Sequence, residues 1–70
     1  MNKKCTKVIS ECAELIQAIY KAERHGWNNW HPNAKSGVYN VDDVMHEIAD
    51  VEKAISELKD FITKRCGNRE

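Results

Sequence analysis

The chain has 70 residues, 41% of them hydrophobic and 31% charged, which is typical of one small folded domain rather than a disordered segment. Lysine plus arginine balance aspartate plus glutamate at 11 each, so neither nucleic acid nor a membrane is expected as a partner, and no segment resembles a membrane span or a signal peptide. Three cysteines without a C-x-x-C pair argue against a disulfide framework or a zinc knuckle and predict a reducing, cytoplasmic environment.

The first predicted element is an amphipathic helix from about residue 4 to residue 25. Its apolar residues recur every third or fourth position and define one face: Val8, Ile9, Cys12, Leu15, Ile16 and Ile19. Asn2 or Thr6 is suited to cap the start, and Gly26, which follows two basic residues, predicts the end. Glu11 and Glu14 are expected beside the apolar face, at the rim of whatever that face packs against.

Residues 26–40 are predicted to form a loop, because they are rich in Asn, Gly, Pro and Ser. The loop is long for a connection between two helices, and long loops are often functional. Three of the five aromatic residues gather in it, namely Trp27, Trp30 and Tyr39. Either these side chains pack the loop onto the helices or cover a dimer interface, or one of them stacks on a planar ligand.

The second predicted helix spans about residues 41–65, with Asn40 as its cap and Asp43 in its first turn. Its apolar face consists of Val44, Ile48, Val51, Ile55, Leu58 and Ile62. The fold class is therefore all-α, a single domain over residues 1–70 with two long amphipathic helices. Because one such hairpin leaves much of each apolar face uncovered, we expect a homodimer that forms a four-helix bundle, or a dimer of dimers. The long connection and zero net charge argue against a helix-turn-helix DNA-binding protein.

Each predicted helix carries two acidic residues three positions apart, Glu11 with Glu14 and Glu47 with Asp50. At this spacing both carboxylates of a pair lie on one helix face, where like charges repel. If the two pairs meet, a hard cation with oxygen ligands, above all Mg²⁺, offsets the repulsion. If they point to solvent on opposite sides, they are ordinary surface charges.

The segments Ser10–Ala18 and His46–Val51 resemble the two motifs, E-x-x-E and E-x-x-D, of the MazG-like all-α nucleoside triphosphate pyrophosphohydrolases. Short, phage-type members also end the first helix with a Lys-Ala-x-Arg-x-Gly-like sequence, as does Lys21–Gly26. The resemblance implies a helical bundle that assembles as a dimer or a dimer of dimers and splits a nucleoside triphosphate into a monophosphate and pyrophosphate. It implies Mg²⁺, or sometimes Mn²⁺, bound by Glu11, Glu14, Glu47 and Asp50.

This chain departs from the family pattern in two places. Ser10 stands where many members have an additional acid, and many members have further helices after the position of Phe61. We therefore expect a second subunit to supply part of the pocket, or the pocket to be reduced.

Other residues complete the expected site. Either Glu14 or Glu47 is expected to position or deprotonate the attacking water. Lys21 and Lys53 are candidates for phosphate contacts, and Trp27 or Trp30 for stacking on the base. The alternative function is a non-catalytic helical dimerisation module or a nucleotide-binding regulatory module.

Overall fold

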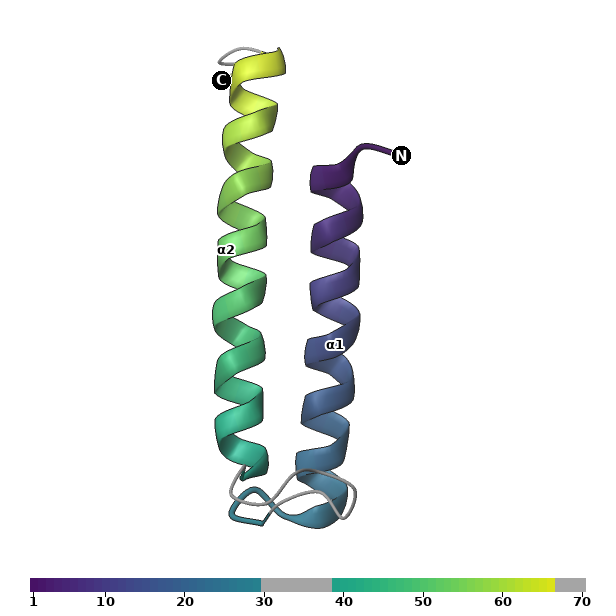
Figure 1. Ribbon diagram of the computed structural model, residues 1–70, viewed down its shortest axis with the longest axis vertical. Coiled ribbons are helices and arrows are strands. Elements are labelled where there is room, and N and C mark those ends of the chain that lie inside the picture. Colours follow the sequence, from purple (N-terminus) through teal and green to yellow (C-terminus); the bar gives the residue numbers. More distant parts are fainter. Residues whose placement is uncertain (30–38, 67–70) are drawn as a thin grey trace.

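The computed structural model describes residues 1–29 and 39–66, which form two α-helices: α1 at Lys3–His25 and α2 at Asn40–Cys66. No strand occurs within these ranges. The helices lie side by side and antiparallel, so the N-terminus and the end of α2 are at the same end of the pair (Figure 1). The predicted all-α class with two long helices is confirmed, and each helix begins and ends within a single residue of the expected position.

The two ends of α1 follow from local sequence. Asn2 caps the start, because its side-chain oxygen accepts a hydrogen bond from the Lys4 N–H at 2.7 Å. At the other end Gly26 has φ 97°, and its N–H donates to the Ala22 carbonyl at 2.8 Å. A side chain at Gly26 would be strained, and its Cβ would lie 2.8 Å from the Asn29 amide nitrogen. Glycine therefore ends α1 at this point.

Asn40 is the first residue of α2 and not the cap that the sequence predicted. The residue is only 4% exposed, and its side-chain nitrogen donates to the Gly26 carbonyl at 2.9 Å. The Tyr39 carbonyl accepts the Asp43 N–H at 3.1 Å, so Tyr39 precedes the first turn. Two backbone hydrogen bonds also join the start of α2 to the segment after α1, from Asn40 to Asn29 and from Val41 to Trp27. Asn40 therefore fixes how the two helices meet.

The contact between the helices is made mainly by small residues. Its centre consists of Ala18, Ala22 and Val44, with Leu15 and Ile48 packed against them. Val51 and Ala54 of α2 are buried further along. Alanine lets two helix backbones approach closely, but it contributes little apolar area. Within the described residues no large side chain is fully buried, so this core is thin.

The predicted apolar face of α1 is rotated relative to the observed contact. The residues of α1 nearest α2 follow a spacing of three and four, and we call them the contact line: Glu11, Leu15, Ala18 and Ala22. By contrast, Ile9 is 57% exposed and Ile16 is 67% exposed. The expectation that Glu11 lies at the rim is therefore wrong, because Glu11 occupies a position on the contact line itself and is 8% exposed.

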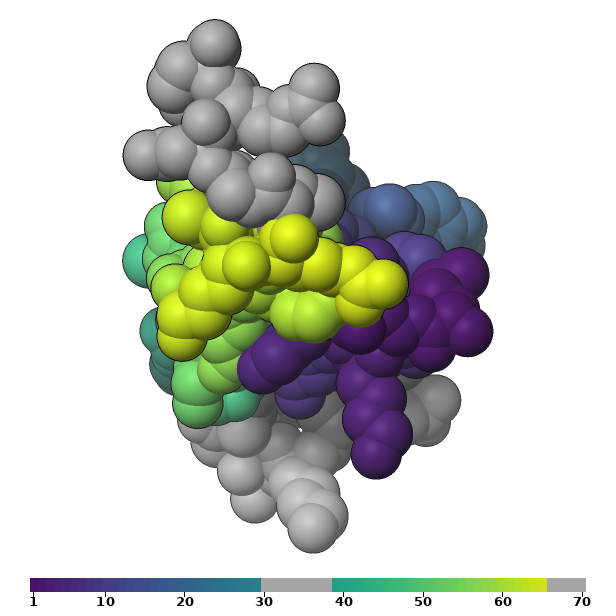
Figure 2. Space-filling view, turned by 90° about the horizontal axis from the view of Figure 1, so that it is seen from above, coloured from purple at the N-terminus to yellow at the C-terminus, as the bar shows by residue number. Residues whose placement is uncertain are grey.

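A large apolar surface remains uncovered on the hairpin. Besides Ile9 and Ile16, it includes several exposed side chains on both helices: Ile19, Tyr20, Met45, Ile55 and Ile62. Seen along the long axis, the start of α1 and the end of α2 lie against each other (Figure 2). No helix in the described part of the chain is long and apolar enough to cross a membrane.

Candidate metal-binding site

Three acidic side chains from the two helices meet at the helix contact. One carboxylate oxygen from each of Glu11, Glu47 and Asp50 lies within 4.8 Å of the other two. We call these three residues the acid cluster. Glu11 belongs to the contact line of α1, and the two acids of α2 lie three residues apart on the side that faces it. The antiparallel pairing thus brings one acid of the first predicted pair beside both acids of the second.

Glu14, the fourth predicted acid, lies one turn beyond Glu11 and is exposed. It is not a member of the acid cluster. Its negative charge nevertheless acts on Glu47, whose pKa it helps to raise. The structure therefore brings three of the four acids together and leaves the fourth within electrostatic range.

Two oxygen atoms of the acid cluster lack partners. Glu11 Oε1 and Glu47 Oε1 are buried, and no group in the described part of the chain donates a hydrogen bond to either. Burial raises the pKa of Glu47 above its ordinary value of 4.5, and the charges of four neighbouring carboxylates raise it further: Glu14, Asp43, Asp50 and Glu11. A buried carboxylate oxygen without a partner is costly, and either a proton or a bound positive charge offsets that cost.

The acid cluster fits a hard divalent cation. Mg²⁺ binds oxygen ligands at about 2.1 Å, so two oxygens on one ion are separated by about 3 to 4 Å. One carboxylate oxygen from each of Glu11, Glu47 and Asp50 lies within 4.8 Å of the other two, which is close to that separation. The donor set contains only carboxylates, which suits Mg²⁺ or Mn²⁺ rather than a softer metal.

Lys7 is a residue of this site that the sequence analysis missed. Its Nζ lies 2.9 Å from Glu11 Oε2, and the hydrogen bond and the charge of Glu11 raise the pKa of Lys7 above 10.5. The signal in the sequence is the spacing of four residues between Lys7 and Glu11, which places both on one face of a helix. His46 Nε2 lies 3.6 Å from Asp50 Oδ2, an ion pair only when the imidazole is protonated.

A pocket of about 260 Å³ adjoins the acid cluster and is lined by residues of both helices: Lys7, Glu11, Asp50, Lys53, Ala54 and Glu57. Lys53, a predicted phosphate contact, therefore lines the same pocket as two acids of the cluster. Lys21, the other predicted contact, is exposed on α1. It lies about 10 Å along the helix axis from Glu14, at about 1.5 Å per residue.

The two tryptophans predicted to contact a base are differently placed. Trp27 Nε1 donates to Glu23 Oε2 at 2.8 Å, and its side chain is 37% exposed. It follows the end of α1, and the last residue of that helix, His25, lies about 16 Å along the helix axis from Glu14, at about 1.5 Å per residue. Trp30 lies outside the described residues. A contact between either ring and a base stays a prediction.

Comparison of the chain with protein-family models, with curated proteins and with solved structures found no match.

Proposed function

We propose that the protein is a Mg²⁺-dependent nucleoside triphosphate pyrophosphohydrolase of the MazG-like type, which converts a ribo- or deoxyribonucleoside triphosphate to the monophosphate and pyrophosphate. One observation carries the proposal: Glu11, Glu47 and Asp50 converge from two helices, with unpartnered buried oxygens on both glutamates. Ordinary surface carboxylates are hydrated, whereas these two glutamate oxygens are buried and have no hydrogen-bond partner. The E-x-x-E and E-x-x-D spacing of these acids supports the same reading.

The acid cluster holds Mg²⁺ in this proposal, and Mn²⁺ is an acceptable substitute. When bound, the ion supplies positive charge that neutralises the phosphates and lowers the pKa of water at the site. Glu14 is exposed next to the acid cluster and outside it, so its carboxylate stays free to position and deprotonate the attacking water. Glu47 is the alternative base, but its burial against Glu11 and Asp50 favours a role in holding the ion.

The substrate phosphates fit the pocket beside the acid cluster. Lys53 lines this pocket, and its ammonium group provides a charge-assisted contact to a phosphate oxygen. Lys21 is a second phosphate contact in this proposal, and Trp27 or Trp30 stacks on the base. The distance of Trp27 from Glu14 along α1 favours a ring supplied by a second subunit.

A homodimer that forms a four-helix bundle is part of the proposal. The helix contact buries mostly alanine and valine, whereas seven large apolar side chains of α1 and α2 are more than a third exposed: Ile9, Ile16, Ile19, Tyr20, Met45, Ile55 and Ile62. A chain of this size rarely folds on so thin a core. A second copy would cover these side chains and supply the walls that one hairpin lacks.

The test is release of pyrophosphate from a panel of ribo- and deoxyribonucleoside triphosphates, measured with Mg²⁺ and with EDTA. The wild-type protein should release pyrophosphate only with the metal, and Glu47→Gln should reduce the rate at least about 100-fold, the usual cost of losing an essential charged group. Glu52→Gln is the matched control, because Glu52 is exposed on the same helix and outside the acid cluster.

Equal rates in wild type and Glu47→Gln would refute the role of the acid cluster. No release from any nucleotide by a folded, dimeric wild-type protein would refute the enzymatic proposal and favour a helical dimerisation or regulatory module.

A further inference from the structure

Lys7 is the one cation in hydrogen-bonding contact with the acid cluster, as far as the described residues show. Its Nζ lies 2.9 Å from Glu11 Oε2, whereas Glu11 Oε1 is buried without a partner. The negative charges of Asp50 and Glu57, both on α2, also favour the charged form of Lys7. A single ammonium group therefore offsets charge that three carboxylates from two helices bring to one place.

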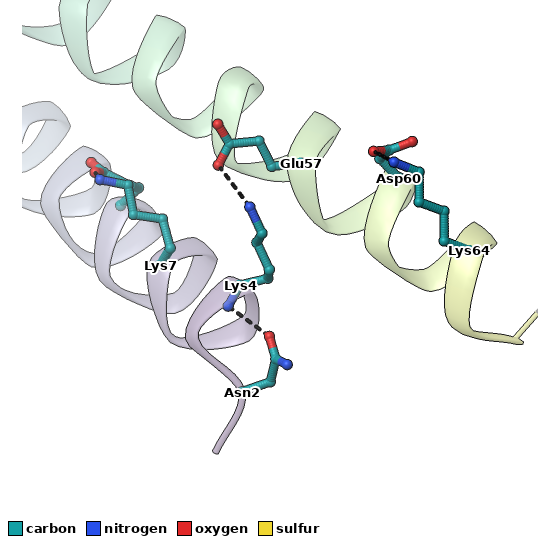
Figure 3. Close-up of polar contacts among 7 residues, drawn as sticks. Asn2, Lys4, Lys7, Glu57, Asp60 and Lys64 are labelled. Atoms are coloured by element: carbon teal, nitrogen blue, oxygen red, sulfur yellow. Dashed lines mark hydrogen bonds and ion pairs between the residues drawn. The ribbon is translucent and has the colours of Figure 1, made fainter.

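The Lys7 side chain is largely exposed, and its ion pair is with a residue of its own helix. It is 58% exposed, and the ion pair with Glu11 lies within one helix at a spacing of four residues. Figure 3 shows Lys7 extended along α1 towards the next turn, while Lys4 reaches across to Glu57 on α2. The lysine end of this pair is solvated although Glu11 is buried, and ion pairs at this spacing within one helix are weak. A divalent cation that takes Glu11 as a ligand can therefore displace the ammonium group.

Displacement does not remove Lys7 from the site. Lys7 and Lys53 both line the pocket of about 260 Å³ beside the acid cluster. With Glu11 bound to metal, the Lys7 ammonium loses its nearest counter-charge and faces this pocket together with Lys53. Two lysines then border the space next to the ion, which suits a doubly or triply charged phosphate chain.

We propose that Lys7 exchanges partners at this site: it neutralises Glu11 in the metal-free protein, and it binds the terminal phosphates of the substrate once a divalent cation has taken Glu11. The inference rests on the proposed function, and it adds a phosphate-binding residue to that function. The same side chain thereby opposes metal binding and supports phosphate binding.

Substitution of Lys7 by methionine tests both halves, because methionine keeps much of the aliphatic stem and a high helix propensity but no charge. Binding of Mn²⁺ is measured by titration calorimetry without nucleotide. Binding of inorganic pyrophosphate is then measured at saturating Mn²⁺. Lys7→Met should bind Mn²⁺ about three- to tenfold more tightly, since a neighbouring positive charge is gone, and pyrophosphate about five- to tenfold more weakly.

Two further variants serve as controls. Lys64→Met removes a matched lysine, whose Nζ lies 3.2 Å from Asp60 at the same spacing (Figure 3). Both residues are exposed, and they follow Asp50 on α2 by ten residues or more. It should leave both affinities unchanged. Lys7→Arg keeps the charge and should remain within about twofold of the wild-type Mn²⁺ affinity.

The opposite signs distinguish partner exchange from a structural role. Unchanged or weaker Mn²⁺ binding by a helical Lys7→Met variant would overturn the proposal, because it would mean that Lys7 holds Glu11 in place for the metal or plays no part. Unchanged pyrophosphate binding would overturn it as well. Absence of Mn²⁺ binding in the wild-type protein would instead refute the proposed function on which it rests.

Discussion

Replacing Glu47 with glutamine should stabilise the metal-free protein, although the substitution removes a proposed functional group. Oxygens of Glu47, Glu11 and Asp50 lie within 4.8 Å of one another, and two like charges at this distance repel by about 0.9 kcal/mol even in water. Lys7 offsets much of the charge of Glu11, and salt screens part of the remainder. We therefore expect Glu47→Gln to raise the free energy of unfolding by about 1 kcal/mol, or the midpoint of thermal unfolding by about 4 to 8 °C.

The assay is thermal unfolding followed by circular dichroism in EDTA at neutral pH, at one fixed protein concentration. Glu52→Gln is again the control, and it should change the free energy of unfolding by less than about 0.5 kcal/mol, as is usual for an exposed position. Saturating Mg²⁺ should reverse the order of the two proteins, because the wild type gains more stability from the ion than Glu47→Gln does.

The effect of Glu47→Gln should depend on pH in a defined direction. The pKa of Glu47 is raised above 4.5 by burial and by the neighbouring carboxylates, so the native state holds this proton more tightly than the unfolded chain does. The stability that the protonated group contributes is fully present below about pH 4.5 and is lost as the pH rises through the raised pKa. The difference between Glu47→Gln and wild type should therefore grow from pH 4.5 to neutral pH.

Two results would refute this reasoning. A metal-free Glu47→Gln variant that is less stable than wild type at neutral pH would show that the charge of Glu47 is not opposed in the folded state. A stability difference that does not change with pH would show that the environment of Glu47 does not alter its titration.

Substitutions away from the acid cluster test the dimer and the meeting point of the helices. Ile16→Lys places a charge on the uncovered apolar side of α1, where Ile16 is 67% exposed, and should convert a dimer to monomer or unfolded chain in light scattering; a dimer of unchanged mass would contradict the four-helix bundle. Asn40→Ala removes the donor to the Gly26 carbonyl and should lower the free energy of unfolding by about 1 to 2 kcal/mol in urea titrations, whereas an unchanged midpoint would show that this hydrogen bond does not fix the helix contact.

The helices were predictable because their signals are local. The Asn2 cap and the Gly26 end depend on residues within one turn, and the structure has both where the sequence indicated them. Asn40 was misassigned because its side chain bonds to the Gly26 carbonyl, a partner fourteen residues away in sequence. Local sequence rules favour Asn40 as a helix cap, but its contact with the end of α1 makes it the first residue of α2 instead.

The contact face was less predictable than the helices themselves. The predicted apolar face of α1 includes Leu15 and Ile16, but Leu15 packs at the contact beside Ala18 and Ala22, whereas Ile16 is exposed. An apolar face can pack against the other helix of the same chain or against a second copy of the chain. Hydrophobicity alone therefore does not show which face of α1 contacts α2. This rotation places Glu11 on the contact line, where its burial could not be read from the sequence.

The acid pairs were recognisable from their spacing, whereas the supporting charges were not. The spacing left open whether the two pairs meet, and it does not show that Glu11, Glu47 and Asp50 come together while Glu14 lies outside the acid cluster. Lys7 was overlooked because a lysine four residues from a glutamate is common on helix surfaces. Its closeness to carboxylates of α2 depends on the pairing of the two helices, which the spacing within α1 does not show.

Anomalous diffraction from crystals grown with Mn²⁺ would show whether acids of α1 and α2 together hold one divalent cation, as we propose. The account predicts an anomalous peak within coordination distance of carboxylate oxygens of Glu11, Glu47 and Asp50, with the Lys7 ammonium moved away from Glu11. A structure at saturating Mn²⁺ with no peak between the helices, and with Lys7 still paired to Glu11, would contradict it.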